Sequence, residues 1–213
     1  SSAWLKMNED ASIEIGVGGQ ELGQGTFTVM AQIAAGALGV PYDWIKIATP
    51  VDTKYSPYEW QTVASRLTWS MGNAVKLAAL DARRQILEMV AEAWNEKIEN
   101  LDIVNGHVIS YQTEESISLK DIVVFGMPKP NYNGWIGGPV YGRGQFMPHY
   151  VTNLDKETGQ GERAVVHYTV GAQAVEVEVD LDTGKIEVIK GASAFDVGKA
   201  INPEMVKAQM EGG

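Results

Sequence analysis

Residues 13–39 read IEIGVGGQELGQGTFTVMAQIAAGALG and combine three signals of local structure. Apolar residues alternate over residues 13–17, which predicts a strand. Residues 16–25 contain five glycines. From residue 27 to residue 38 apolar residues recur at helical spacing until Gly39, a typical helix C-cap. The stretch therefore predicts a strand, a glycine-rich loop and a helix in direct succession.

The regions around this stretch predict hairpins and one long helix. Residues 3–17 alternate loosely around a polar turn, and residues 101–111 carry Asn105-Gly106, a strong hairpin signal. The longest helical signal runs from residue 73 to about residue 98, with opposite apolar and charged faces. We also expect a short strand at residues 44–48, an irregular loop at 52–62, and no regular structure at 126–148, where Gly and Pro recur.

The C-terminal part predicts a long hairpin followed by a helix. Residues 174–180 alternate strictly, residues 185–194 form the returning strand, and Asn202-Pro203 is a typical helix start. The whole pattern predicts an α+β fold with antiparallel hairpins, one long helix and one or two shorter helices. The expected organisation is a first α+β subdomain at 1–125, an irregular connecting segment at 126–160, and a truncated second subdomain at 161–213.

The composition is that of a globular protein, since 45% of the 213 residues are hydrophobic, 21% are charged and the net charge is −10. No basic cluster is present to meet phosphates, which disfavours nucleic acid as a partner. The lack of cysteine excludes disulfides, zinc–thiolate sites and iron–sulfur clusters on this chain. No apolar run approaches the roughly 18 residues of a membrane span, so we expect a cytoplasmic protein.

The two ends favour an internal piece of a longer protein. The chain has no initial Met, and it stops just after the predicted helix start at residues 202–203. We therefore expect further sequence on both sides.

The glycine loop is the first candidate ligand site. Glycines let backbone N–H groups approach a ligand closely, and the start of the following helix favours an anion. The spacing is not that of a dinucleotide-binding fingerprint, because residue 21 is Glu, and the Gly-Lys-Ser/Thr of a P-loop is missing. A wide structural turn between strand and helix explains the glycines equally well.

Residues 62–68, TVASRLT, form the second candidate site. Hydroxyl groups and an arginine beside a helix start suit the recognition of phosphate. The alternative is plain helix capping by Ser70 or Asn73, with Arg66 on a solvated face.

Weaker candidates lie further along the chain. Residues 196–204 with Gln209 are adequately explained by helix capping. Asp180 and Asp182 fit a hairpin turn better than a calcium site. The three histidines are too scattered to predict a zinc site.

Several motifs stand in a characteristic order from about residue 3 to residue 213, most weakly at 100–160. They are Gly19-Gln-Glu-Leu-Gly-Gln-Gly25 with Gln32-Ile-Ala34, Asp52-Thr53 with Pro57, Ala64-Ser-Arg-Leu-Thr68 with Gly72-Asn-Ala-Val75, the hairpin of residues 171–184, Asp196 to Pro203, and Gln209 to Gly213. Together they resemble the molybdenum-cofactor-binding subunit of the xanthine dehydrogenase and aldehyde oxidoreductase family. The resemblance implies that this chain is an internal fragment of the molybdopterin-binding domain of such a subunit.

The resemblance implies a molybdenum–molybdopterin cofactor, with or without a cytosine dinucleotide, in the full-length parent. It implies that Gly23, Gln24 and Gly25 contact the pyranopterin and the ligand sphere of the molybdenum. Ala64 corresponds to the residue beside the metal. The remaining cofactor-binding residues implied are Ser65, Arg66 and Thr68 around the cofactor's phosphate, and Gln209, which matches a glutamine that hydrogen-bonds the pterin.

The resemblance also implies the activity of the parent. Such an enzyme oxidises aldehydes or N-heterocycles with water-derived oxygen and passes electrons to iron–sulfur and flavin subunits or domains. The family's glutamate base and substrate-orienting residues have no counterpart here, so no catalytic residue and no protein ligand to the metal is assigned. We expect the isolated chain to carry no cofactor and to be inactive.

Two other functions remain open at this point. The isolated chain could be a cofactor-free structural or interaction module, whose uncovered apolar surface favours a homodimer. A phosphate-binding protein unrelated to molybdenum is disfavoured by the missing P-loop and dinucleotide-binding patterns.

Overall fold

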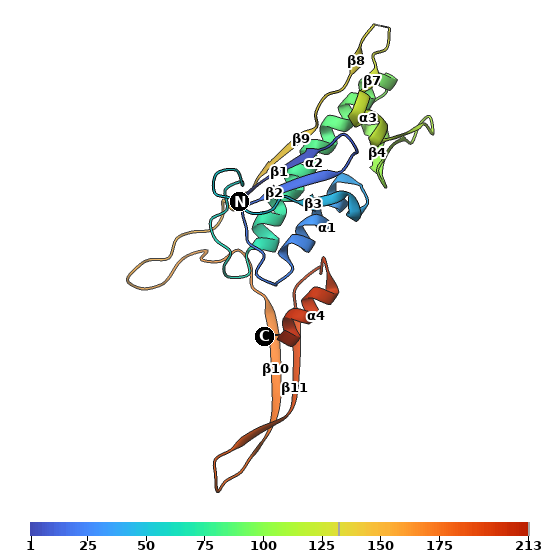
Figure 1. Cartoon of the computed structure of the whole chain (residues 1–213). Coiled ribbons are helices and arrows are strands. Elements are labelled where there is room, and N and C mark those ends of the chain that lie inside the picture. The colour runs from blue at the N-terminus through green and yellow to red at the C-terminus, as the bar shows by residue number, and fades with distance from the viewer. Residues whose placement is uncertain (132, 213) are drawn as a thin grey trace. The chain divides into compact units, whose positions relative to one another are not determined.

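The central sheet is built on the N-terminal hairpin that the alternating pattern predicts. The computed structural model describes residues 1–131 and 133–212, so Tyr132 and the terminal Gly213 of the expected second subdomain lie outside the described residues. The sheet has the order β3-β2-β1-β9 (Figure 1). Its strands are β1 (Ser2–Met7), β2 (Ile13–Val17), β3 (Ile45–Ile47) and β9 (Tyr141–Gln145). Strand β1 pairs antiparallel with β2 and β9, and β3 pairs parallel with β2.

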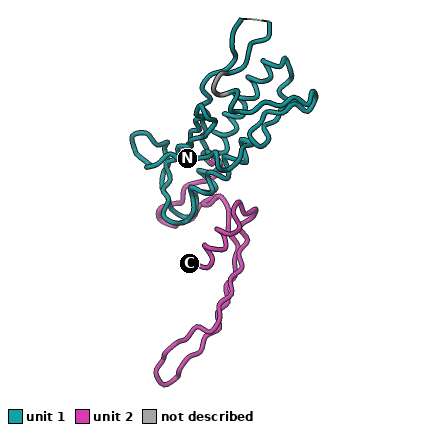
Figure 2. Tube along the Cα trace, turned by 45° about the vertical axis from the view of Figure 1, so that its right-hand side comes forward, with its two compact units in different colours: residues 1–147 teal, residues 148–213 magenta. Residues whose placement is uncertain are grey.

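The chain divides into two compact units, residues 1–147 and 148–213 (Figure 2). In the first unit, helices α1 (Thr26–Leu38) and α2 (Leu67–Trp94) pack against each other and against the sheet. Helix α1 connects the parallel strands β2 and β3, and it ends at Gly39 in the left-handed conformation, as predicted. The core lies between sheet and helices; its largest fully buried side chains include Leu5, Ile13, Ile15, Met30, Leu38, Met71, Ile86 and Val90.

Helix α2 begins six residues earlier than the sequence predicts, at Leu67 instead of residue 73. Its first turns are held by packing, because Leu67 and Met71 are buried against Gly19. A Cβ atom at Gly19 would lie 2.9 Å from Leu67 Cδ1 and 2.9 Å from Met71 Sδ. Ser70 is therefore a helical residue and no N-cap, and its hydroxyl donates to the carbonyl of Arg66 (2.9 Å).

Shorter elements surround this core. The predicted hairpin at residues 101–111 is confirmed, with left-handed Asn105 and Gly106 at its tip. The additional elements are the short helices η1 (Tyr42–Trp44) and η2 (Ile98–Asn100), strands β4 (Leu101–Val104), β5 (His107–Ser110) and β6 (Ser116–Ser118), helix α3 (Leu119–Phe125), and the strand pair β7 (Met127–Pro128) and β8 (Trp135–Ile136).

The prediction of no regular structure at residues 126–148 is wrong for three strands, the short pair β7 and β8 and the longer strand β9. Two of its five residues are Gly142 and Gly144, which conceal the strand pattern. A Cβ atom at Gly144 would lie 1.9 Å from the carbonyl oxygen of Ala74, and one at Gly142 would lie 2.1 Å from that of Ala78. Helix α2 therefore rests directly on the backbone of β9, and the glycines permit this contact.

The second unit contains the predicted long hairpin and C-terminal helix. Strands β10 (Val170–Val179) and β11 (Ile186–Asp196) pair antiparallel, and α4 (Pro203–Gly212) follows. The Asn202 side chain accepts a hydrogen bond from the Met205 N–H (3.1 Å), which confirms it as the N-cap. The α+β fold class is confirmed. In the part of the chain that the structure describes, no helix has the length and apolarity needed to cross a membrane.

Asp180 shapes the turn of this hairpin. Its carboxylate accepts hydrogen bonds from the backbone N–H groups of Thr183 and Asp182, each 2.9 Å long. These bonds lower the pKa of Asp180 below its ordinary value. The carboxylate is thus engaged within the turn, in agreement with the hairpin interpretation.

We predict that Gly144→Ala lowers the free energy of unfolding by about 1–3 kcal/mol, because the added methyl group displaces α2 from β9. The control is Gly36→Ala on the exposed side of α1, where a Cβ atom meets nothing within 4 Å. That change should raise the stability by about 0.5–1 kcal/mol. Urea denaturation followed by circular dichroism measures both, and equal stabilities of the two variants would contradict the close contact.

Candidate functional site

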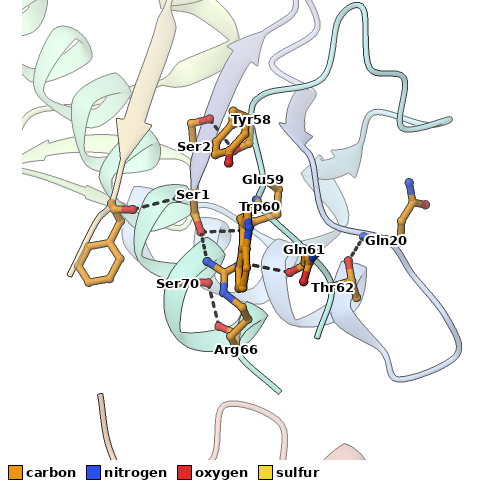
Figure 3. Close-up of polar contacts among 11 residues, drawn as sticks. Ser1, Ser2, Gln20, Tyr58, Glu59, Trp60, Gln61, Thr62, Arg66 and Ser70 are labelled. Carbon is orange, nitrogen blue, oxygen red and sulfur yellow. Dashed lines mark hydrogen bonds and ion pairs between the residues drawn. The ribbon is translucent and has the colours of Figure 1, made fainter. Parts of the chain in front are cut away.

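The two candidate segments of the first unit lie side by side. The backbone N–H of Gln20 donates to Thr62 Oγ1 (3.0 Å), which joins the glycine loop to residues 62–68 (Figure 3). The contact of Gly19 with Leu67 adds a second connection. The loop leading into α1 and the first turn of α2 thus form one surface region.

Glu21 occupies the N-terminus of α1. Its Oε1 accepts hydrogen bonds from the N–H groups of Gly23 (2.8 Å) and Gly25 (2.9 Å), and its Oε2 accepts one from Phe27 (3.0 Å). Burial raises the pKa of Glu21, but the donors Phe27, Gly25 and Gly23 outweigh burial, so the net pKa is lowered. The carboxylate of Glu21 therefore occupies the helix N-terminus at which the sequence predicts an anionic ligand.

Gln24 holds the same loop from within. Its Nε2 donates to the carbonyl of Gln20 (2.9 Å) and to Thr26 Oγ1 (2.7 Å), while its Oε1 accepts from the N–H of Leu22 (2.6 Å). Gly23 has φ of 102°, and a Cβ atom there would meet nothing within 4 Å. The loop is thus a structural turn whose backbone at Gly23 faces open space.

Residues 64–68 present groups suited to an anion. Ala64 and Ser65 both adopt φ of 52°, and they are exposed together with Thr68. Non-glycine residues in this left-handed region carry strain, which is often found at functional sites. The N–H groups of Leu67 and Thr68 have no acceptor within the helix. Two exposed hydroxyl groups, together with backbone N–H groups that have no intrahelical acceptor, are therefore present at the start of α2.

Arg66 precedes the first turn of α2 and is largely buried. Its guanidinium pairs with the Glu59 carboxylate, donates to the carbonyl of Gln61 (3.1 Å) and lies 5.7 Å from the centre of the Trp60 ring (Figure 3). The alternative that places Arg66 on a solvated face is wrong, because only 22% of the side chain is exposed.

The start of α2 offers exposed hydroxyl groups to an anion, whereas the Glu21 carboxylate already accepts the N–H groups at the start of α1. Among the described residues no three His, Asp or Glu side chains gather as metal ligands. Gln209 lies on α4 of the second unit and is exposed. Sequence reasoning did not assign roles to Glu21 and Glu59. Glu21 stands in the quoted glycine motif, whereas no local pattern identifies Glu59.

Comparison with known proteins identifies relatives across the whole chain. A family model described as a molybdopterin cofactor-binding domain matches residues 1–213. The chain is 25% identical over 215 residues to the xanthine dehydrogenase molybdenum-binding subunit of Escherichia coli O157:H7, covering 100% of this chain and 26% of that protein.

Solved structures agree with this match. The reconstituted CO dehydrogenase from Oligotropha carboxidovorans aligns with a TM-score of 0.80 and 25% identity over 100% of this chain and 24% of that one. The aldehyde oxidoreductase from Desulfovibrio gigas aligns with a TM-score of 0.68 and 25% identity over 100% and 20%. The chain spans about a quarter of the length of the curated relatives it matches.

We predict that Glu21→Gln lowers the free energy of unfolding by about 1.5 kcal/mol at pH 7, because the charged acceptor of three N–H groups is lost. Since the folded-state pKa of Glu21 is lowered, its contribution is complete above the ordinary pKa of a glutamate and disappears as the pH falls through the lower folded-state value.

Urea denaturation at a series of pH values tests this dependence. The difference between the two proteins should shrink below about pH 4. The exposed Glu9→Gln serves as the control. A difference that stays constant down to pH 2 would contradict the role of the Glu21 charge.

Proposed function

The chain belongs to the molybdopterin cofactor-binding domains of the xanthine dehydrogenase and aldehyde oxidoreductase family, and we propose that it supplies part of the cofactor cradle of a longer molybdenum hydroxylase. The observation that carries this proposal is the hydrogen bond between Gln20 and Thr62. It unites, in one exposed region, the two segments that the family pattern assigns to the cofactor.

Each candidate residue has a proposed part in holding the cofactor. The hydroxyl groups of Ser65 and Thr68 and the guanidinium of Arg66 bind the phosphate, supported by the N–H groups of the first turn of α2, which have no intrahelical acceptor. The remaining proposed contacts are Gly23, Gln24 and Gly25 with the pyranopterin, Ala64 beside the metal, and Gln209 with the pterin ring.

The bound molybdenum centre supplies the oxidation of a substrate carbon with oxygen derived from water. The residues of this chain orient the cofactor and do not serve as bases. Glu21 and Glu59 both accept several hydrogen bonds, and the lowered pKa of Glu21 makes it a poor proton acceptor. We therefore propose that the base comes from a part of the enzyme outside this chain.

The substrate and partners follow from the same proposal. The names of the relatives, a xanthine dehydrogenase subunit and an aldehyde oxidoreductase, support an aldehyde or N-heterocycle as substrate. Electrons would pass to iron–sulfur and flavin subunits or domains, and the cofactor would be molybdopterin with or without a cytosine dinucleotide. A cytoplasmic location completes the proposal.

We predict that the full-length protein, purified from its native host, contains molybdenum and pterin, whereas the isolated 213-residue chain contains neither and oxidises no aldehyde or purine. Metal analysis and fluorescence of the oxidised pterin measure both contents. A full-length protein without metal or pterin would contradict the proposal that the parent is a molybdenum enzyme.

A second function is that the isolated chain is a cofactor-free interaction module. The observation that favours it is the hairpin of the second unit, in which every residue of β10 and β11 is exposed. Val175 (61% exposed), Ile186 (63%) and Val188 (66%) add apolar surface to these strands. Exposed apolar strands favour association with another chain.

We predict that the isolated chain elutes as a homodimer in size-exclusion chromatography with light scattering. Val175→Lys with Val188→Lys should shift it to monomer, because charges on exposed strands oppose pairing. A monomeric unchanged chain at 100 μM would count against the interaction module.

A further inference from the structure

Glu59 is a buried acid in an otherwise exposed loop. Its side chain is 1% exposed, although the neighbouring Tyr58 and Trp60 are 70% and 61% exposed. One carboxylate oxygen, Oε1, accepts hydrogen bonds from Arg66, from Ser1 Oγ (3.1 Å) and from the Trp60 N–H (3.1 Å) (Figure 3). The other oxygen, Oε2, is buried without a hydrogen-bond partner among the described residues.

The backbone around Gly18 makes this burial possible. A Cβ atom at Gly18 would lie 2.2 Å from the carbonyl oxygen of Pro57 and 2.9 Å from Glu59 Cβ. The loop therefore rests directly on the chain after β2, and Glu59 points inward. A buried carboxylate is unfavourable unless a cation compensates it, and Arg66 is the cation it meets.

The contacts of Arg66 fix the plane of its guanidinium group. Nη1 donates to Glu59 and to the Gln61 carbonyl (3.1 Å), and Nη2 donates to Ser1 Oγ (3.5 Å). The guanidinium also lies over the face of the Trp60 ring. A guanidinium carries five N–H groups, and three of them make these hydrogen bonds to described residues, which leaves Nε and one hydrogen of Nη2 for another acceptor as far as the described part of the chain shows. A held guanidinium loses less conformational freedom on binding an anion than a mobile one.

We propose that Glu59 is a positioning residue for cofactor binding, which holds Arg66 in the orientation that receives the anionic group of the cofactor. This inference rests on the proposed function of residues 64–68. It predicts the direction in which cofactor binding changes when the Glu59 charge is removed. The negative charge of Glu59 offsets the positive charge of Arg66, but its removal weakens cofactor binding because the arginine is no longer held.

The test compares variants of the full-length protein purified with its cofactor. Molybdenum and pterin per protein are measured before and after repeated dilution and concentration, together with the melting temperature. Glu59→Gln should lose cofactor about ten-fold faster than the unchanged protein, a typical effect of removing a residue that orients a ligand-binding group. Retention equal to or greater than that of the unchanged protein overturns the inference.

A matched control separates positioning from general stability. Arg83 and Asp102 form another ion pair of α2, with side chains 27% and 33% exposed. Asp102→Asn should lower the melting temperature while cofactor loss stays at the unchanged rate. If Asp102→Asn accelerates cofactor loss as much as Glu59→Gln, the effect is general destabilisation and the inference fails.

The charge swap Glu59→Arg with Arg66→Glu provides a second, independent comparison. The swap keeps an ion pair between the loop and α2, so it applies even where Glu59→Gln folds poorly. It should recover melting temperature but not cofactor retention, because the cation no longer stands at residue 66. Full recovery of cofactor retention in the charge-swapped variant would show that the Glu59–Arg66 ion pair has only a structural role. An unchanged protein without molybdenum and pterin overturns the proposed function and this inference together, whereas normal loading with normal retention in Glu59→Gln overturns the inference alone.

Discussion

Direct contact of one backbone with another is the constraint on which the first unit depends. Helix α2 lies directly on the backbone of strand β9 at Gly142 and Gly144, where carbonyl oxygens of the helix leave no room for a methyl group. The same helix packs its first turn against Gly19, and the loop before it packs against Gly18. The position of the candidate site thus follows from how closely α2 can approach the sheet, which only glycine allows at these points.

This constraint divides the glycine loop into parts with different roles. Gly18 and Gly19 serve packing, whereas Gly23 and Gly25 have the left-handed conformations needed to direct their N–H groups to Glu21. A motif that suits an anionic ligand in sequence is therefore mostly engaged by the protein itself. The groups that stay available lie at the start of α2, in residues 64–68. The candidate anion site therefore depends more on the contact between the glycine loop and residues 62–68 than on the glycine motif alone.

Local patterns predict much of the fold, and long-range contacts explain what they miss. The hairpins at residues 3–17, 101–111 and 174–194 follow from alternation and turn residues, and the Asn202 cap follows from its position before proline. Strand β9 is not predicted because glycines stand at the positions where an alternating strand would carry apolar residues. These glycines are needed because the backbone of α2, about 70 residues earlier in the chain, lies directly against them.

The candidate site shows the same division. The family motifs indicate residues 23–25 and 64–68, but no local pattern reveals Glu59 or the partners of Arg66. Ser1 lies 58 residues before Glu59 and 65 before Arg66, so its contacts are long-range. Glu59 and Arg66 are only seven residues apart, but an irregular loop joins them, and no periodic pattern fixes how their side chains meet. Pairings of this kind are decided by tertiary packing and lie beyond propensity and spacing.

The strain at Ala64 and Ser65 connects these features. Each left-handed non-glycine residue costs about 1 kcal/mol, so an isolated loop would relax to an extended conformation. Here the loop is held on both sides, by the Gln20–Thr62 hydrogen bond before the strained pair and by the Glu59–Arg66 ion pair directly after it. The stored strain is then compensated by contacts made without any ligand. A ligand that binds the exposed hydroxyl groups meets a loop already in its strained conformation, and its binding energy is not spent on ordering the chain.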